Sequence, residues 1–275
     1  MDGHSGGPYH CESREKPYRS MPVRPVLARL LAIAALGAGA LAFDASAVVP
    51  APSRLVVWAW ERPEDLRFLP PDAEIAVQSG FVELSGSQAY ARGRRFPLLA
   101  RSRQVTIAVV HIQIDPHRPL LWTPALRADA ARAAIQLADA PGVTRVQIDF
   151  EVLASQRQVL LDLLTDVRAA LPAATRLSMT ALASWCEHED WLRGAPVDEI
   201  APMLFRMGPD GGVIVRQLAA GGDFHPACRS ALAVSADTPL PQAPTGRRVY
   251  LFSPRSWTPA DFAIVQKRVD AWRAP

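Results

Sequence analysis

Lysine, cysteine and net charge are all scarce in this chain of 275 residues. Its 30 basic and 27 acidic side chains leave a formal net charge of +3, and Lys16 and Lys267 are the two lysines. Nucleic-acid binding usually needs a basic stripe interleaved with aromatic side chains. The nearest candidate is a group of five arginines: Arg92, Arg94, Arg95, Arg101 and Arg103. Such a group is more often a solvated loop, so we expect no nucleic-acid partner.

The apolar run Leu30–Phe43 is too short for a comfortable membrane span. A basic segment begins at Met21 before it, and Ala45–Ala47 follows with the small residues of a signal-peptidase site. We therefore predict a signal peptide over residues 21–47 and a periplasmic or secreted protein. An uncleaved N-terminal membrane anchor is the alternative. Residues 1–20 are then a disordered extension or follow a misassigned start.

The cysteines limit the metal and redox chemistry of the mature chain. Cys11 lies upstream of the predicted signal peptide, which leaves Cys186 and Cys228 as an even pair. In an oxidising compartment such a pair forms a disulfide, and two unrelated buried thiols are the alternative. Neither cysteine has the CxxC or Cys/His spacing of a zinc site. We expect no metal and no cofactor.

The stretch Val143–Glu151 is the most informative pattern in residues 54–275, which we predict to form one domain. Read with the period of two of a strand, it has an apolar face and a polar face. The apolar face holds Val146, Ile148 and Phe150, and the polar face holds Arg145, Gln147, Asp149 and Glu151. In an antiparallel sheet the polar face would simply meet water. Helical runs on both sides predict instead a parallel strand buried on both faces, where carboxylates persist mainly if they are paired or used.

Seven further strands are predicted from apolar and alternating runs. They cover Leu55–Trp60, Glu74–Ser79, Gln104–Asp115, Arg176–Ala183, Val197–Met207, Arg229–Ala236 and Arg248–Phe252. Helices are predicted between most of them, but residues 81–103 resemble a hairpin and an irregular loop starts at Asp237. The sequence therefore predicts an α/β fold, a compact and partly degenerate (β/α)8 TIM-like barrel with helices after strands two and seven reduced or missing. An open doubly wound sheet is the alternative, but no Gly-rich phosphate loop follows the first strand.

One helix is predicted in detail. Ser155 is expected to cap it and Gln158 to complete a capping box, before Pro172 ends the helix. Its apolar stripe comprises Val159, Leu160, Leu163, Leu164, Val167 and Leu171. The spacing of this stripe predicts one face packed on the barrel.

In such a barrel the active site lies where the strands meet the loops that follow them. The polar and aromatic residues expected there are Trp58, Trp60, Glu61, His111, Gln113, Gln147, Asp149, Glu151, Trp185, Met203, Phe205, Arg206, Asp237, Arg255 and Trp257. Flat indole faces suit the CH surfaces of sugars, and carboxylates supply proton transfer. The combination favours a carbohydrate ligand. For the tryptophans, barrel packing is an equally good interpretation, and Met203 and Phe205 are better explained as core.

Gln147–Glu151 resembles the end of the Asp-x-Asp-x-Asp-x-Glu signature of the chitinase-like, family-18-type glycosidases. The resemblance implies that Glu151 protonates the glycosidic oxygen and that Asp149 orients and tunes it. It also implies that Met203, Phe205 and Arg206 correspond to the family's Met-x-Tyr-Asp, and that Trp257 corresponds to the tryptophan of the pocket floor. Phe205 and Arg206 depart from that pattern, because Phe cannot donate a hydrogen bond and Arg reverses the charge.

A longer resemblance covers nearly the whole mature chain. Val146–Glu151, Leu177–Cys186 and Ala201–Gly208 are similar to an uncharacterised bacterial domain-of-unknown-function family related to those TIM-barrel glycoside hydrolases. This resemblance implies a fold and no assigned reaction. Arg206 stands where the chitinase-like family has an aspartate. An arginine at this position would suit an anionic sugar or a salt bridge to Glu151 or Asp149.

Three functions remain open from the sequence. The first is a glycoside hydrolase with Glu151 as general acid and Asp149, Glu61 or Asp237 as its partner carboxylate. The second is a catalytically inactive glycan-binding barrel in which Arg145 or Arg206 locks the acidic pair. The third is a metal site at His111, Asp149 and Glu151, although no short histidine spacing supports it. We expect a monomer whose partner is a carbohydrate and which meets a membrane only through an uncleaved signal sequence.

Overall fold

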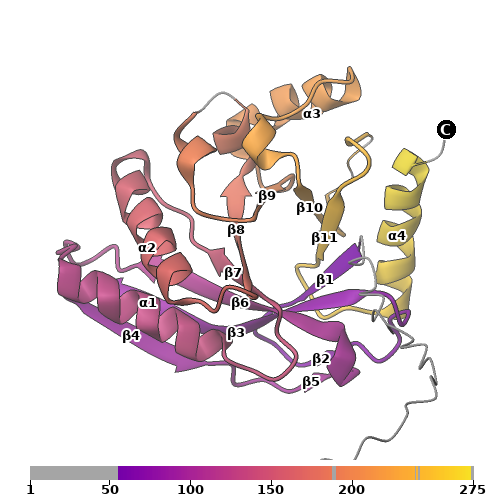
Figure 1. Cartoon of the computed structure of the whole chain (residues 1–275). Coiled ribbons are helices and arrows are strands. Elements are labelled where there is room, and N and C mark those ends of the chain that lie inside the picture. Colours follow the sequence, from indigo (N-terminus) through magenta and orange to yellow (C-terminus); the bar gives the residue numbers. More distant parts are fainter. Residues whose placement is uncertain (1–54, 188–189, 239, 241, 274–275) are drawn as a thin grey trace, which may run out of the picture. The chain divides into compact units, whose positions relative to one another are not determined.

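The computed structural model describes residues 55–187, 190–238, 240 and 242–273 (Figure 1). Eight parallel strands follow one another around a closed barrel: β1 (Leu55–Ala59), β3 (Glu74–Ser85), β6 (Val105–Ile114), β7 (Arg145–Asp149), β8 (Arg176–Leu182), β9 (Glu199–Met203), β10 (Ala231–Ser235) and β11 (Arg248–Phe252). Closure comes from β1, which pairs in parallel with both β11 and β3. The predicted α/β barrel is thereby confirmed. The predicted extension and signal peptide lie outside the described residues.

Four α-helices occur in the described part of the chain: α1 (Pro124–Ala138), α2 (Arg157–Ala170), α3 (Gly211–Ala219) and α4 (Pro259–Arg273). The short 3-10 turns are η1 (Ser102–Gln104), η2 (Ala154–Gln156), η3 (Ala183–Cys186), η4 (Trp191–Gly194), η5 (Gly208–Asp210) and η6 (Pro226–Cys228). Figure 1 shows α1 and α2 lying beside each other on the outside of the sheet. None of the helices so described is long and apolar enough to cross a membrane.

The start of α2 differs from its predicted form. The chain passes through η2 first, and Gln156 rather than Ser155 precedes the helix, without a side-chain cap. The Gln156 carboxamide instead accepts a hydrogen bond from the backbone nitrogen of Leu153 at 3.0 Å, and Gln158 bonds Asp162. The predicted cap was therefore wrong, because the tight turn after β7 occupies the residues that would have formed it. The predicted apolar stripe is buried as expected.

The segment after β3 forms a hairpin, as the sequence predicts. β3 continues six residues beyond its predicted end at Ser79, because its extension pairs antiparallel with β4 (Gln88–Gly93). Gly86 turns the chain with a φ of 61°, a conformation that suits glycine. Two short strands, β2 (Glu64–Asp65) and β5 (Leu98–Leu99), pair beside the barrel. Between β10 and β11 the described residues contain no helix.

Apolar side chains form two separate cores. The outer core lies between the strands and the helices, and it includes Val146 and Ile148 of β7 and Phe150 directly after it. The inner core fills the barrel with Val56, Trp58, Ala76, Ile107, Val109, Ala201, Met203, Phe205, Ala231, Ala233, Tyr250 and Phe252. The alternation in β7 thus separates two environments, and its polar face points into the barrel, where Gln147 bonds Trp58.

A buried ionic layer closes the amino-terminal end of the barrel. Every second strand contributes one charged side chain to it: Glu74 from β3, Arg145 from β7, Glu199 from β9 and Arg248 from β11. Arg145 lies 3.1 Å from Glu199, and Arg248 lies 3.3 Å from Glu199 and 2.9 Å from Glu74. These contacts skip intervening strands, so they cross the barrel interior. Arg145 is therefore held at the end opposite to Glu151.

Candidate active site at the barrel mouth

Asp149, the last residue of β7, is held by side chains from both neighbouring strands. His111 Nδ1 on β6 lies 2.7 Å from its Oδ2, and the Thr180 hydroxyl on β8 donates to its Oδ1 at 2.6 Å. His111 and Asp149 are directly opposite each other in the register of β6 and β7. Asp149 is 5% exposed, so both carboxylate oxygens use protein partners in place of water. We call this end of the strands the barrel mouth.

Glu151 follows two residues later, with part of its side chain open to solvent. Partial burial raises the pKa of Glu151, the negative charge of Asp149 raises it further, and His111 and Arg206 oppose the rise. Glu151 also lines an open depression of about 680 Å³, whose other walls come from residues 113–120, Leu153 and Gln156. A carboxyl that retains its proton beside an open depression can act as a proton donor.

Aromatic rings form one wall of the mouth. Phe205 and Phe252 are stacked with centroids 4.9 Å apart and planes 4° from parallel. Trp60, partly exposed, meets Phe252 edge-on at 5.9 Å and His111 edge-on at 6.0 Å. Phe81 from β3 meets His111 at 5.3 Å, also with its ring steeply inclined to the imidazole. The histidine ring therefore contacts two aromatic rings, and Trp60, which is partly exposed, offers a surface to a ligand.

Arg206 stands at the mouth in an uncommon backbone conformation. Its φ of 53° is the only positive value at a non-glycine residue in the described part of the chain. The guanidinium is exposed and lies 5.8 Å from the ring centre of Phe252. Its positive charge acts on Glu151 and on Asp237, but it forms no salt bridge with either described carboxylate. Arg206 therefore does not lock Glu151.

Two further predicted site residues are engaged in local bonds. Glu61 accepts the backbone nitrogen of Arg95 at 2.9 Å and pairs with Arg92 at 3.3 Å. Asp237 accepts hydroxyl hydrogen bonds from Ser235 and Thr238, which hold the pKa of that carboxyl below its usual value. Both carboxylates therefore already have partners, Asp237 within its own segment and Glu61 on β4 and the residues that follow it.

Except for Gln113, which lines the depression beside Glu151, the remaining predicted residues lie beneath the mouth or away from it. Trp58, Gln147 and Met203 are buried in the barrel interior below it. Trp185 and Trp257 pack in the outer core, where Trp257 donates to the backbone oxygen of Trp58 at 3.0 Å. Gln113 is exposed and bonds Glu83, and Arg255 is exposed and pairs with Asp261 on α4. The indoles on which the sequence argument relied are therefore mostly packing residues, with Trp60 as the exception.

Sequence reasoning missed Thr180, Phe81 and Phe252. Thr180 and Phe252 could have been found from strand alternation, since both lie near the ends of predicted strands at positions whose side chains face the barrel interior. Phe81 could not, because β3 was predicted to end before it. Arg92 was seen only as part of a basic cluster, whereas it lies 3.7 Å from the Phe81 ring centre and acts electrostatically on His111.

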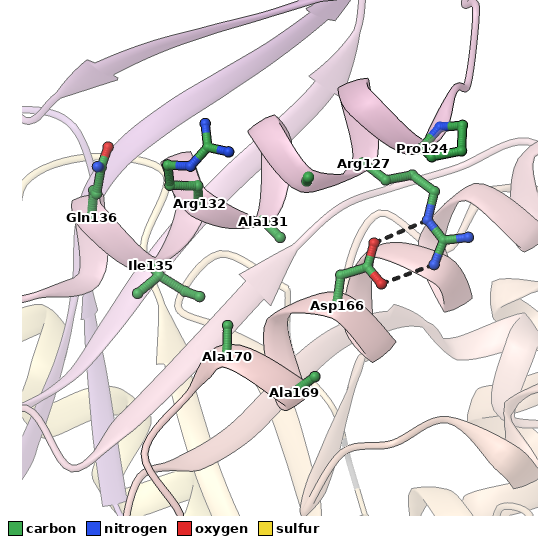
Figure 2. Close-up of a pocket in the computed structure, with 10 residues that line it drawn as sticks. Pro124, Arg127, Ala131, Arg132, Ile135, Gln136, Asp166, Ala169 and Ala170 are labelled. Atoms are coloured by element: carbon green, nitrogen blue, oxygen red, sulfur yellow. Dashed lines mark hydrogen bonds and ion pairs between the residues drawn. The ribbon is translucent and has the colours of Figure 1, made fainter.

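A larger depression, about 720 Å³, lies between α1 and α2 on the outside of the barrel (Figure 2). Alanines on both helices leave it open, since their side chains are too short to fill the space between the helix axes. Its most buried charges are already paired, because Arg127 binds both carboxylate oxygens of Asp166 at 2.9 Å. The charged groups nearest its centre are therefore already paired, and the barrel mouth, which holds a carboxyl group that is unpaired among the described residues, is the better candidate.

The predicted disulfide is present between Cys186 at the end of η3 and Cys228 at the end of η6, with Cα atoms 5.8 Å apart. Its presence fits an oxidising compartment. Among the described residues, no group of three or more His, Cys, Asp or Glu side chains has the arrangement of a metal site.

Comparison with known proteins found no matching family model, no matching curated sequence and no matching solved structure. The geometry of the mouth must therefore carry the functional argument.

Proposed function

We propose that this protein is an exported glycoside hydrolase that acts on a bacterial or environmental polysaccharide. Glu151 is the general acid that protonates the glycosidic oxygen. Asp149 is the neighbouring charge that keeps this proton on Glu151 at higher pH. This assignment carries over to residues 149 and 151 the roles implied by the resemblance to chitinase-like glycosidases.

The observation that carries the proposal is the contrast between these two carboxyl groups. Asp149 uses both oxygens in hydrogen bonds to His111 and Thr180. Glu151 has no hydrogen bond to a described residue, and burial and the charge of Asp149 raise its pKa. Two nearby acids with such different surroundings are typical of sites that need a fixed charge beside a proton donor.

The surroundings support a carbohydrate ligand. Trp60 is partly exposed and meets both His111 and Phe252 edge-on, and such aromatic surface packs on the CH faces of sugars. Phe205 and Phe252 are buried, so they support Trp60 and do not themselves face a ligand. The open depression next to Glu151 has room for part of a glycan. Arg206 stands where it can meet an anionic group.

The alternative is a glycan-binding barrel without activity, and one observation favours it. The position that supplies the substrate-steadying tyrosine in family-18-type enzymes is Phe205, which stacks on Phe252 and has no hydroxyl group. This alternative also expected a salt bridge from Arg145 or Arg206 to Asp149 or Glu151. Arg145 instead pairs with Glu199 at the far end of the barrel, and Arg206 forms no salt bridge with Glu151. The hydrolase therefore remains the preferred function.

Two finer points belong to the same proposal. We infer that the chain is a reduced TIM-like barrel of the uncharacterised bacterial family that its strand motifs resemble, with a hairpin and a loop in place of helices two and seven. We also infer export through the signal peptide at residues 21–47, in agreement with the Cys186–Cys228 disulfide.

The test is turnover by the mature chain on chitin, peptidoglycan and acidic exopolysaccharide fragments, beside Glu151→Gln. We expect wild type to release reducing ends and Glu151→Gln to lose about 100-fold or more of that rate, because it removes the proton donor. Asp129→Asn, an exposed carboxyl replacement on α1 at the outside of the barrel, is the matched control. Equal background release by wild type and Glu151→Gln, with glycan still retained on a column, would favour the binding barrel.

A further inference from the structure

If water attacks the anomeric carbon directly while Glu151 protonates the leaving oxygen, a second group must accept a proton from that water. The carboxylates that the sequence suggested for this role are already engaged. Asp149 bonds His111 and Thr180, Glu61 bonds Arg95 and Arg92, and Asp237 bonds Ser235 and Thr238. A different residue type therefore fits the second role better.

His111 has the geometry of such a group. An ionised carboxylate only accepts hydrogen bonds, so the contact of Nδ1 with Asp149 places the proton on Nδ1. In the neutral ring, Nε2 then carries the lone pair. Nε2 has no hydrogen-bond partner among the described residues, and the side chain is 26% exposed. Contacts with the rings of Trp60 and Phe81, together with the bond to Asp149, restrict rotation of the imidazole.

We propose that His111 is the second catalytic residue of the mouth, a general base whose Nε2 takes a proton from the attacking water. This inference rests on the proposed hydrolase. The water oxygen forms a bond to the anomeric carbon as the glycosidic C–O bond breaks. The electrons of that bond go to the leaving oxygen, which takes the proton of Glu151. The product therefore has the inverted anomeric configuration, and Asp149 and Thr180 are positioning residues.

The charges that face His111 support this role. Burial lowers the pKa of His111, but the hydrogen bond and the charge of Asp149 outweigh burial, Glu151 adds to the rise and Arg92 on β4 opposes it. The net result is a pKa above 6.5. The pKa of Glu151 is in turn raised by partial burial and by the charge of Asp149, and lowered by the charges of His111 and Arg206. The charges of His111 and Glu151 therefore each shift the pKa of the other, and we expect a bell-shaped dependence of activity on pH.

The first test is NMR of the imidazole nitrogens in the whole mature chain. We expect neutral His111 to carry its proton on Nδ1 and to leave Nε2 unprotonated. Asp149→Asn should lower the pKa of His111 by about one unit or more, since it removes a negative charge in direct contact. A neutral ring protonated at Nε2, or an unchanged pKa in Asp149→Asn, would overturn the assignment whether or not a glycan is cleaved.

The second test uses whichever of the three glycans named above is cleaved. Activity should fall on the acid side of the optimum, because His111 must be neutral to accept a proton. His111→Gln should lower the rate about 100-fold or more. The same substitution should also abolish the fall in activity on the acid side. His225→Gln, remote from the mouth, is the matched control and should keep both limbs. In His111→Ala, added azide should replace water as the nucleophile, because azide needs no base to remove a proton. Turnover should then be restored, and the product should be a glycosyl azide of inverted configuration.

The two proposals fail in different ways. Absence of turnover on all three glycans would contradict the hydrolase itself, whatever the tautomer of His111. Turnover with a retained anomeric configuration, or a His111→Gln profile that is lower but unchanged in shape, would leave the hydrolase standing and refute the base role of His111.

Discussion

The indole Nε1 of Trp58 donates a hydrogen bond of 2.8 Å to Oε1 of Gln147 across the barrel interior. Trp58 belongs to β1 and Gln147 to β7, with β3 and β6 between them. Because the carboxamide oxygen faces the indole, Nε2 of Gln147 is buried without a partner. This bond ties the floor of the mouth to the strand that carries Asp149.

Replacement of Gln147 by Met should destabilise the protein by about 1–3 kcal/mol, because it leaves the buried indole N–H of Trp58 without an acceptor. Urea unfolding measures the change. A double-mutant cycle combines this change with Trp58→Phe. Trp58→Phe should lower the free energy of unfolding less in the Gln147→Met background, where its hydrogen-bond acceptor is already absent. Additive losses would mean that the bond contributes nothing.

The ionic layer at the other end of the barrel should be sensitive to the loss of one charge. Glu199 accepts the Tyr250 hydroxyl at 2.6 Å and pairs with Arg145 and Arg248. Glu199→Gln would leave the buried guanidinium of Arg145 without a carboxylate partner, whereas Arg248 keeps Glu74, at a cost of about 3–5 kcal/mol in the free energy of unfolding. Asp65→Asn, in an exposed pair with Arg67, is the control and should leave the urea midpoint unchanged. Similar midpoints for both variants would contradict the importance of the layer.

His111 should make stability depend on pH. Burial lowers the pKa of His111, but its bond to Asp149 outweighs burial, so the folded value lies above the unfolded value of 6.5. Because the pKa of His111 is higher in the folded state, protonated His111 adds to the free energy of unfolding. This stabilisation is complete below pH 6.5 and is lost as pH rises through the pKa of the folded state. The stability difference between wild type and His111→Gln should therefore be largest on the acid side. Urea midpoints at about pH 5.5 and about pH 9 test this, and a constant difference would refute it.

The disulfide should stabilise the domain by restricting its unfolded state. Cys186 and Cys228 are separated by 42 residues, and a closed loop of this length is worth about 2–4 kcal/mol. The double variant Cys186→Ala/Cys228→Ala should lose that much. Reductant should lower the thermal midpoint of wild type and leave that of the variant unchanged, whereas equal sensitivity would mean that the thiols are not paired.

Strand and helix positions were accessible from the sequence where local pattern decides them. β11 has its predicted bounds, and the buried stripe of α2 follows the predicted spacing, because alternation and the helical period depend on neighbours in the chain. The cap of α2 and the extension of β3 could not be predicted from the sequence. The cap depends on the turn after β7, and the extension depends on the pairing with β4.

The sequence by itself determined that Asp149 and Glu151 end a strand of an α/β barrel and that two cysteines remain to pair. Only the tertiary structure decided which partners these groups have. Asp149 meets His111 from 38 residues away and Thr180 from 31 residues away, and Arg145 meets Glu199 at the opposite end of the barrel. The physical reason is that side chains from separate strands meet only once the barrel has closed in one register, and no local period encodes that register.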